Sequence, residues 1–289
     1  MKPEIEFFRI ISIFGITWFH SGVTAGKDIA YGGLIFFTIV SVYFSATSKR
    51  DHRVFERIER LIIPCVIWSI FYGLFSLILK DHIFPENYNT ISKILATPAI
   101  HLWFLPFIFI VTITIDRFRF LLLAEWFQII IGASAVISII SAPIWREVNY
   151  IAPFGQYAHA LPAVLIGLFL STYSQMRVKL RLFITLGLIS SILLMLYKQE
   201  SGIGVPYIIG LAPCIFLFRQ NILIKHNELL LWVASSTFGV YLLHIFTLSI
   251  MKHVGVSGIA LPIFAFIIAL CTILLFKKYV PKKLSKYIA

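Results

Sequence analysis

Three ionisable residues, Glu6, Arg9 and His20, interrupt the apolar run EFFRIISIFGITWFH at positions 6–20. Arg9 and His20 are eleven residues apart. At about 100° per residue this is three helical turns and about 20°, so both share one helix face, about 16 Å apart along the axis. Glu6 precedes Arg9 by three residues on that face, within reach of an ion pair. Because ionisable residues are rare in so apolar a run, this face is a candidate functional site.

A second cluster lies in RIERLIIP at positions 57–64. Arg57 and Arg60 are three residues apart, so on an α-helix both project to the same side. Paired guanidinium groups suit the phosphates of a nucleotide-containing cofactor. The alternative, which the spacing alone favours, is that they are ordinary positive charges at the inner end of a membrane helix.

A third group, HLWFLP at positions 101–106, places His101 two residues before Trp103. An aromatic surface beside a polar group is a common way to hold a sugar. The same two residues are also consistent with a solvated loop histidine next to a tryptophan at the membrane interface. The sequence leaves both interpretations open.

The fourth group is a polar stripe within STFGVYLLH at positions 236–244. Thr237, Tyr241 and His244 are spaced four and three residues apart, which places them on one face of a helix. Such neighbours can hold a histidine in one tautomer, as a reactive site requires. The competing interpretation is structural hydrogen bonding between helices.

The composition places all these residues in a membrane protein. Of the 289 residues 59% are hydrophobic and 13% are charged, and the mean hydropathy is +0.91, well above that of a soluble domain. A helix needs roughly 17–25 predominantly apolar residues to cross a bilayer. The sequence therefore predicts an all-α fold of about ten transmembrane helices, at 7–24, 30–48, 59–79, 100–116, 125–143, 153–172, 180–197, 203–218, 229–250 and 259–276.

The positions of Lys and Arg predict the orientation of this bundle. With a cytoplasmic N-terminus, 19 of the 25 basic residues lie on the inner side, as the positive-inside rule requires, and both termini are cytoplasmic. The net charge of +12 then reflects topology and attraction to anionic lipid, not nucleic-acid binding. The inner set is Lys2, Arg9, Lys49, Arg50, Arg53, Arg57, Arg60, Arg117, Arg119, Arg177, Lys179, Arg181, Arg219, Lys225, Lys277, Lys278, Lys282, Lys283 and Lys286, and the outer set is Lys27, Lys80, Lys93, Arg146, Lys198 and Lys252.

The loops between these spans are short, about twenty residues at most. We therefore expect a single membrane domain over residues 1–289 without an appended soluble domain. Cys65, Cys214 and Cys271 all lie within predicted spans and have the spacing of neither a disulfide framework nor a metal site.

The predicted location in a membrane is what makes the ionisable residues of positions 6–20 informative. An ionisable group at membrane depth costs a few kcal/mol, on the order of 3 on insertion scales, and marks a functional site by default. Two structural explanations compete with that interpretation. Arg9 can extend to the inner headgroups, and a neighbouring helix can satisfy His20 by a hydrogen bond.

Taken together, the clusters resemble the acyltransferase-3 family of membrane acyltransferases, which O-acylate surface glycans and related acceptors. The resemblance spans nearly the whole chain in the same order. It rests on Glu6, Arg9 and His20 in the first helix, on IFFTIVSVYFS at 35–45, on Arg-x-x-Arg and Pro at 57–64, on HLWFL at 101–105 and on STFGVYLLH at 236–244.

This chain departs from the family pattern at two places. Glu6 stands where the family usually has Asp, which preserves a carboxylate for Arg9. Ser41 and Val42 stand where a Ser-Gly pair is common, so a close backbone approach at that point of the second helix is in question.

The resemblance implies a reaction and a set of site residues. The donor is cytoplasmic acetyl-CoA, a co-substrate whose phosphates Arg57 and Arg60 hold at the inner face, and no metal is expected. His20 is the general base toward the acceptor hydroxyl, and Arg9 and Glu6 complete the catalytic group. His101, Trp103, Tyr241 and His244 are implied to contact the substrates.

The expected product is an O-acetylated cell-surface polysaccharide or lipid-linked precursor, such as an exopolysaccharide, capsule or O-antigen, made at the inner membrane. A lipid or small-molecule acceptor is the alternative within the same chemistry. A transporter or flippase for a lipid-linked sugar is the alternative from another class. It predicts an internal repeat and broken helices in paired positions, and neither is evident in the sequence.

Overall fold

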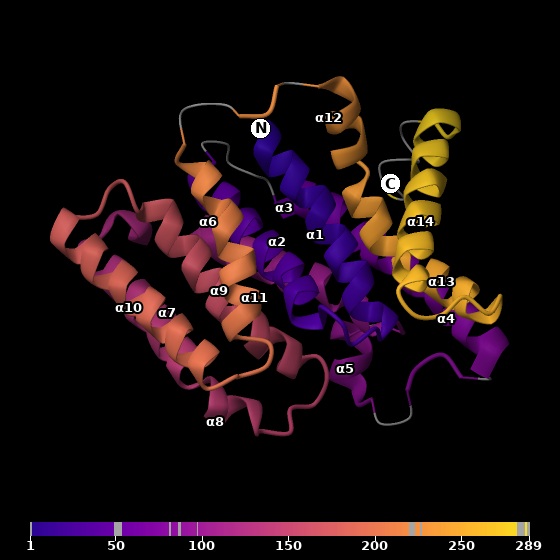
Figure 1. The fold of residues 1–289 in the computed structure, drawn as a ribbon, viewed down its shortest axis with the longest axis horizontal. Helices are drawn as coiled ribbons and strands as arrows, with labels where there is room; N and C mark the ends of the chain where they lie inside the picture. Colours follow the sequence, from indigo (N-terminus) through magenta and orange to yellow (C-terminus); the bar gives the residue numbers. More distant parts are fainter. Residues whose placement is uncertain are drawn as a thin grey trace. The chain divides into compact units, whose positions relative to one another are not determined.

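The computed structural model describes residues 2–48, 54–80, 82–85, 88–96, 98–219, 223–225, 227–281 and 287. Within these residues the regular structure is entirely helical, as the sequence predicts, and no strand is present (Figure 1). Six basic residues of the predicted inner side lie outside the described residues: Lys49, Arg50, Arg53, Lys282, Lys283 and Lys286.

Each of the ten predicted ranges contains helix. The helices in these ranges are α1 (Pro3–Ser21), α2 (Lys27–Thr47), α3 (Val54–Arg57) continuing through the π-helical turn η1 (Ile58–Ile62) into α4 (Ile63–Lys80), η2 (Ile100–Trp103) with α6 (Phe104–Phe118), α7 (Glu125–Ile140), α9 (Phe154–Thr172), α10 (Val178–Tyr197), α11 (Gly204–Leu211) with η4 (Ala212–Leu217), α12 (Glu228–Ala234), α13 (Thr237–His253) and α14 (Ala260–Tyr279). The connecting segments include α5 (Thr90–Leu95), η3 (Arg119–Leu123) and α8 (Ala142–Arg146).

Length and composition define which described helices can cross a membrane. Five can do so, namely Lys27–Thr47, Val54–Leu79, Phe154–Thr172, Val178–Tyr197 and Ala260–Tyr279, and α12 with α13 makes a sixth if the bent pair is one span. α7 and the segment Gly204–Leu217 are apolar but shorter. α1 has 19 residues and carries charged residues in its first turns. The protein is thus a multi-pass helical membrane protein, and five or six of the ten predicted crossings have the length and composition of a span.

The range 229–250, which the sequence predicts as one uninterrupted helix, is broken in the structure. α12 and α13 meet at an angle of 52° around Ser235 and Ser236. The two serine hydroxyls donate to the carbonyl of Trp232 at 2.7 and 3.2 Å, and such back-bonding bends helices. Lys277 of α14 donates to both hydroxyl oxygens, at 2.6 and 3.3 Å. The hydroxyl groups explain a break that could not be predicted from the apolar composition of this range.

The chain forms two compact units, one of Met1–Phe37 and Gly204–Ala289 and one of Thr38–Ile203. In the first unit α1 packs against α12, α13 and α14. α1 also approaches the start of α2 closely, because a Cβ on Gly15 would lie 2.8 Å from the carbonyl oxygen of Ala30. Such contacts through small residues are typical of helices that pack within membranes.

The start of α1 is tied to the end of η4 and to the segment that follows it. Lys2 donates from Nζ to the carbonyls of Phe216 and Leu217, both at 2.9 Å. These carbonyls belong to the C-terminal end of a helix, where positive charge is favourable. Glu4 accepts the backbone N–H of Leu223 at 2.5 Å. Both ends of the first unit's sequence therefore contribute to one packed body.

In the second unit α7 packs against α9 and α10. α9 also meets the second half of α2 at Gly167, where an added Cβ would lie 2.8 Å from Val42 Cβ and 2.9 Å from the carbonyl oxygen of Ile39. The presence of Val42 instead of glycine had put a close approach of α2 in question. The structure shows that the glycine permitting this approach stands on the opposing helix.

Candidate functional site

The first unit contains the ion pair that the spacing in α1 predicts. Arg9 Nη1 lies 2.9 Å from Glu6 Oε2, and the two side chains are 21% and 6% exposed. Arg9 Nη2 also donates to Oγ1 of Thr237, the first residue of α13, at 3.3 Å. The carboxylate neutralises the arginine, and the threonine links α1 to the polar stripe of α13.

The two predicted histidines of this unit are neighbours. The ring centroids of His20 on α1 and His244 on α13 are 5.3 Å apart, with an angle of 47° between the ring planes. His244 is fully buried, whereas His20 is partly exposed. The Tyr241 ring lies 5.9 Å from that of His244. The helix face that begins with Glu6 therefore ends beside the polar stripe, an arrangement that neither helix reveals alone.

The hydrogen bond of His244 defines its tautomer. Nδ1 of His244 lies 2.6 Å from the carbonyl oxygen of Tyr241, one turn earlier in α13. Since a carbonyl oxygen can only accept, Nδ1 carries the proton. In the neutral imidazole the basic nitrogen is then Nε2, the atom that can accept a proton or a hydrogen bond.

The second unit contains a different charged cluster, built around Asp116 of α6. Arg57 donates from Nε to Asp116 Oδ2 at 2.7 Å and from Nη2 to Ser45 Oγ at 3.1 Å. Arg119 donates to Asp116 Oδ1 at 2.8 Å and to the Ser45 carbonyl at 3.0 Å. Two guanidinium groups thus share one carboxylate, which leaves an excess positive charge.

Arg57 and Arg60 differ in their surroundings, although the sequence predicts that they project together. Arg57 is largely enclosed by Asp116 and Ser45, whereas Arg60 is exposed. Arg60 lies within the π-helical turn Ile58–Ile62, which begins directly after Arg57 and changes the angle per residue from that of an α-helix. Such turns occur frequently at functional sites.

His101 and Trp103 lie in the short 3₁₀ turn η2 before α6 and are both buried, at 2% and 7% exposure. The His101 ring meets Tyr72 edge to face at 5.0 Å, and Trp103 packs 5.9 Å from Tyr157. The solvated-loop interpretation of His101 and the belt interpretation of Trp103 are therefore both wrong. The two residues belong to an aromatic cluster inside the second unit.

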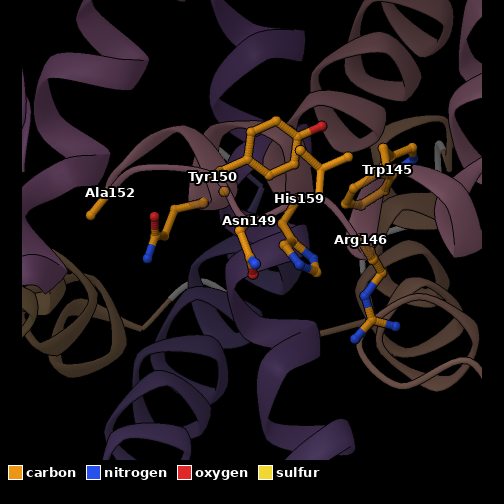
Figure 2. A pocket seen from close by; sticks show the side chains of 9 residues that line it. Trp145, Arg146, Asn149, Tyr150, Ala152 and His159 are labelled. Carbon is orange, nitrogen blue, oxygen red and sulfur yellow. The ribbon is translucent and has the colours of Figure 1, made fainter.

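A cavity that the sequence did not point to lies at the start of α9. It has a volume of about 260 Å³. Figure 2 shows Asn149, His159 and Arg146 extending to the same side, with Tyr150 and Trp145 beside them. The complete lining is Trp145, Arg146, Val148, Asn149, Tyr150, Ala152, Gly155, Gln156 and His159.

Within the described ranges, no three His, Cys, Asp or Glu side chains are grouped as metal ligands would be. The chemical groups that the two units offer are imidazoles, guanidinium groups, carboxylates and hydroxyls on otherwise apolar helices.

The comparison with protein families identifies the class. The family model for the acyltransferase domain matches residues 2–277. The chain therefore belongs to the acyltransferase-3 family, as the resemblance of its motifs indicates. Searches of curated proteins and of solved structures gave no match.

Proposed function

We propose that this membrane acyltransferase transfers an acetyl group from cytoplasmic acetyl-CoA to a hydroxyl of a cell-surface polysaccharide or its lipid-linked precursor, at the inner membrane. The observation that supports this best is the pairing of His20 with His244, 5.3 Å apart, on a helix face that begins with the Glu6–Arg9 ion pair. An alcohol is a poor nucleophile until its proton is removed, and an imidazole is suited to remove it.

In the proposed reaction His20 takes the proton of the acceptor hydroxyl. The hydroxyl oxygen forms the new ester bond with the thioester carbon, the carbon–sulfur bond breaks, and the CoA thiolate receives the proton from the imidazolium. Nε2 of His244 accepts a hydrogen bond from the acceptor hydroxyl or from protonated His20, and Tyr241 forms the adjoining wall. Arg9, neutralised by Glu6, orients the donor and fixes α1 to α13.

In the proposed donor site, Arg60 contacts the CoA phosphates, since it is an exposed residue of the described chain. Arg57 orients that contact from its position against Asp116. The excess positive charge of the Arg57, Asp116 and Arg119 cluster adds a longer-range attraction for phosphate. His101 and Trp103 are both buried. They therefore support the proposed site indirectly, through the aromatic cluster to which they belong.

The proposal is tested by measuring acetyl esters on surface glycan with and without the gene, and with His20→Ala in its place. The expected result is loss of the esters with normal glycan export in both altered strains. Membrane fractions must contain the variant at the wild-type level. Wild-type acetylation by His20→Ala would overturn the assignment.

A second candidate function is transport of a lipid-linked sugar, which the break between α12 and α13 favours because transporters use discontinuous helices. Loss of the glycan itself, instead of its acetyl esters, would support this candidate. Labelled acyl-CoAs offered to the purified protein with extracted glycan, lipid or small alcohols distinguish the acceptor classes and the acyl chain length.

A further inference from the structure

We infer that the cavity at the start of α9 binds a neutral sugar ring of the acceptor. This inference rests on the proposed function and adds the acceptor subsite to it. The cavity lies wholly within the second unit and includes none of the residues that the family motifs identify. Its residues come from α8, from the turn that follows it and from the first two turns of α9.

The walls of the cavity are held in place. The Trp145 ring meets the His159 ring edge to face at 5.0 Å, and its Nε1 donates to the carbonyl of Ser138 at 2.9 Å. Ser92 of α5 donates to the carbonyl of Ala152, which fixes the turn. A preorganised site binds with a smaller loss of conformational freedom than a mobile one.

The polar groups of the lining match those of a sugar hydroxyl. Asn149 and Gln156 each carry an amide that can both donate and accept. Among the described residues, Gln156 Oε1 and Arg146 Nε are buried and have no hydrogen-bond partner. Buried polar atoms are normally paired. A hydroxyl is at once a donor for Gln156 Oε1 and an acceptor for Arg146 Nε.

The charge of the lining favours a neutral ring over a phosphate or a carboxylate. Arg146 Nη1 lies 3.3 Å from Glu200 Oε2, so its charge is already offset. The volume of about 260 Å³ lies just below the range of roughly 300–1,000 Å³ for sites of drug-sized ligands, which suits one ring and not an oligosaccharide or an acyl chain. The exposed Tyr150 ring offers an aromatic face.

The predicted topology places this cavity where a surface glycan would meet the protein. The turn that carries Asn149 and Tyr150 lies on the outer side in the orientation given by the Lys and Arg distribution. His159 and Gln156 are three residues apart on α9, so both face the cavity, whereas Tyr157 between them packs against Trp103. The same helix turn thus contributes to the cavity and to the buried aromatic cluster.

Sugar binding is measured on the full-length, detergent-purified protein by saturation-transfer NMR. The probes are glucose, galactose, N-acetylglucosamine, glucuronate and inorganic phosphate. We expect a signal from at least one neutral sugar, at least tenfold weaker binding in Asn149→Ala and in Gln156→Leu, and wild-type binding in Glu147→Gln, an exposed neighbour outside the lining. Absence of any neutral-sugar signal, or competition by phosphate or glucuronate, would overturn the inference.

Acylation kinetics separate this inference from the proposed function. With extracted, unacetylated glycan as acceptor, the two lining variants should show about a tenfold higher KM for glycan, which corresponds to about 1.4 kcal/mol, and an unchanged KM for acetyl-CoA. Wild-type KM for glycan in both variants would overturn the sugar site and leave the transferase intact. Neutral-sugar binding without any glycan acylation by the wild type would instead remove the proposed function. Asn149 is exposed in a turn, so its variant keeps the test valid if Gln156→Leu folds poorly.

Discussion

The two charged clusters of this protein use arginine in opposite ways. In the first unit Arg9 meets one carboxylate from its own helix, and the pair is neutral. In the second unit Arg57 and Arg119 share Asp116, and the cluster keeps a positive charge with Arg60 exposed nearby in the sequence. In the proposed function the neutral pair lies on the helix face that also carries His20, and the excess positive charge of the other cluster suits a polyanionic co-substrate. In the proposed function, the imidazole that reacts belongs to the first unit and the arginines that hold the anion belong to the second.

The largest expected effect comes from removing the proposed general base of the first unit. His20→Ala should lower the rate of acetyl transfer by about 10²–10⁴-fold, the usual contribution of a general base. Acetyl release from labelled acetyl-CoA to extracted glycan measures it. Ile11→Val, an exposed change on the same helix, should keep wild-type activity. Equal losses in both variants would indicate damage to α1 instead of lost chemistry.

The next effect separates donor binding from chemistry. Arg60→Gln should raise the KM for acetyl-CoA by about 10–100-fold with kcat unchanged, because a hydrogen bond to a charged group contributes about 1.5–3 kcal/mol. Steady-state kinetics at varied acetyl-CoA measures this split. Arg117→Gln removes an exposed charge outside the cluster and should leave KM unchanged. A fall in kcat alone would place Arg60 in the reaction and not in donor binding.

A third change compares the carboxylates of the two clusters. Asp116→Asn leaves two partly buried arginines without their shared carboxylate and should destabilise the protein by about 1–3 kcal/mol. Glu6→Gln releases only Arg9, with an expected cost of about 1 kcal/mol, and Glu6→Asp should restore the pair. Thermal unfolding in detergent compares the three variants. A larger shift in Glu6→Gln than in Asp116→Asn would reverse the comparison.

The last change concerns the scaffold of the second unit and is expected to affect stability alone. Gly167→Ala places a methyl group 2.8 Å from Val42 Cβ, and such overpacking costs about 1–3 kcal/mol. Adding Val42→Ala to the variant should recover part of that loss, because it removes the opposing methyl groups. Unfolding midpoints of the single and double variants give the coupling. Additive effects would show that the two residues are not in contact.

The sequence predicted the parts of the site that depend on helical periodicity. The Glu6–Arg9 pair and the stripe of Thr237, Tyr241 and His244 follow from spacing on single helices, and the structure contains both. The pairing of His20 with His244 depends on how α1 packs against α13, which spacing within one helix does not determine.

The cluster around Asp116 could not be predicted from local sequence patterns. Asp116 is 59 residues from Arg57, and only its position before Arg119 in DRFR hinted at a role. The π turn after Arg57 and the break at Ser235 arise from hydrogen bonding within runs that read as continuous apolar helix. The cavity residues come from two helices and the turn between them and form no motif in the sequence, so their grouping emerges only from the fold.

The composition of the first unit from both ends of the chain has a consequence for its synthesis. His20 and His244 are separated by 224 positions, which at roughly 5–20 residues per second takes about 10–45 s to translate. During that interval α1 exists without α12, α13 and α14, the helices that pack against it in the finished protein. Glu4, Glu6 and Arg9 must then be shielded by one another, by headgroups or by the insertion machinery. The nascent chain therefore lacks part of the packing of its first unit until the last three helices have been synthesised.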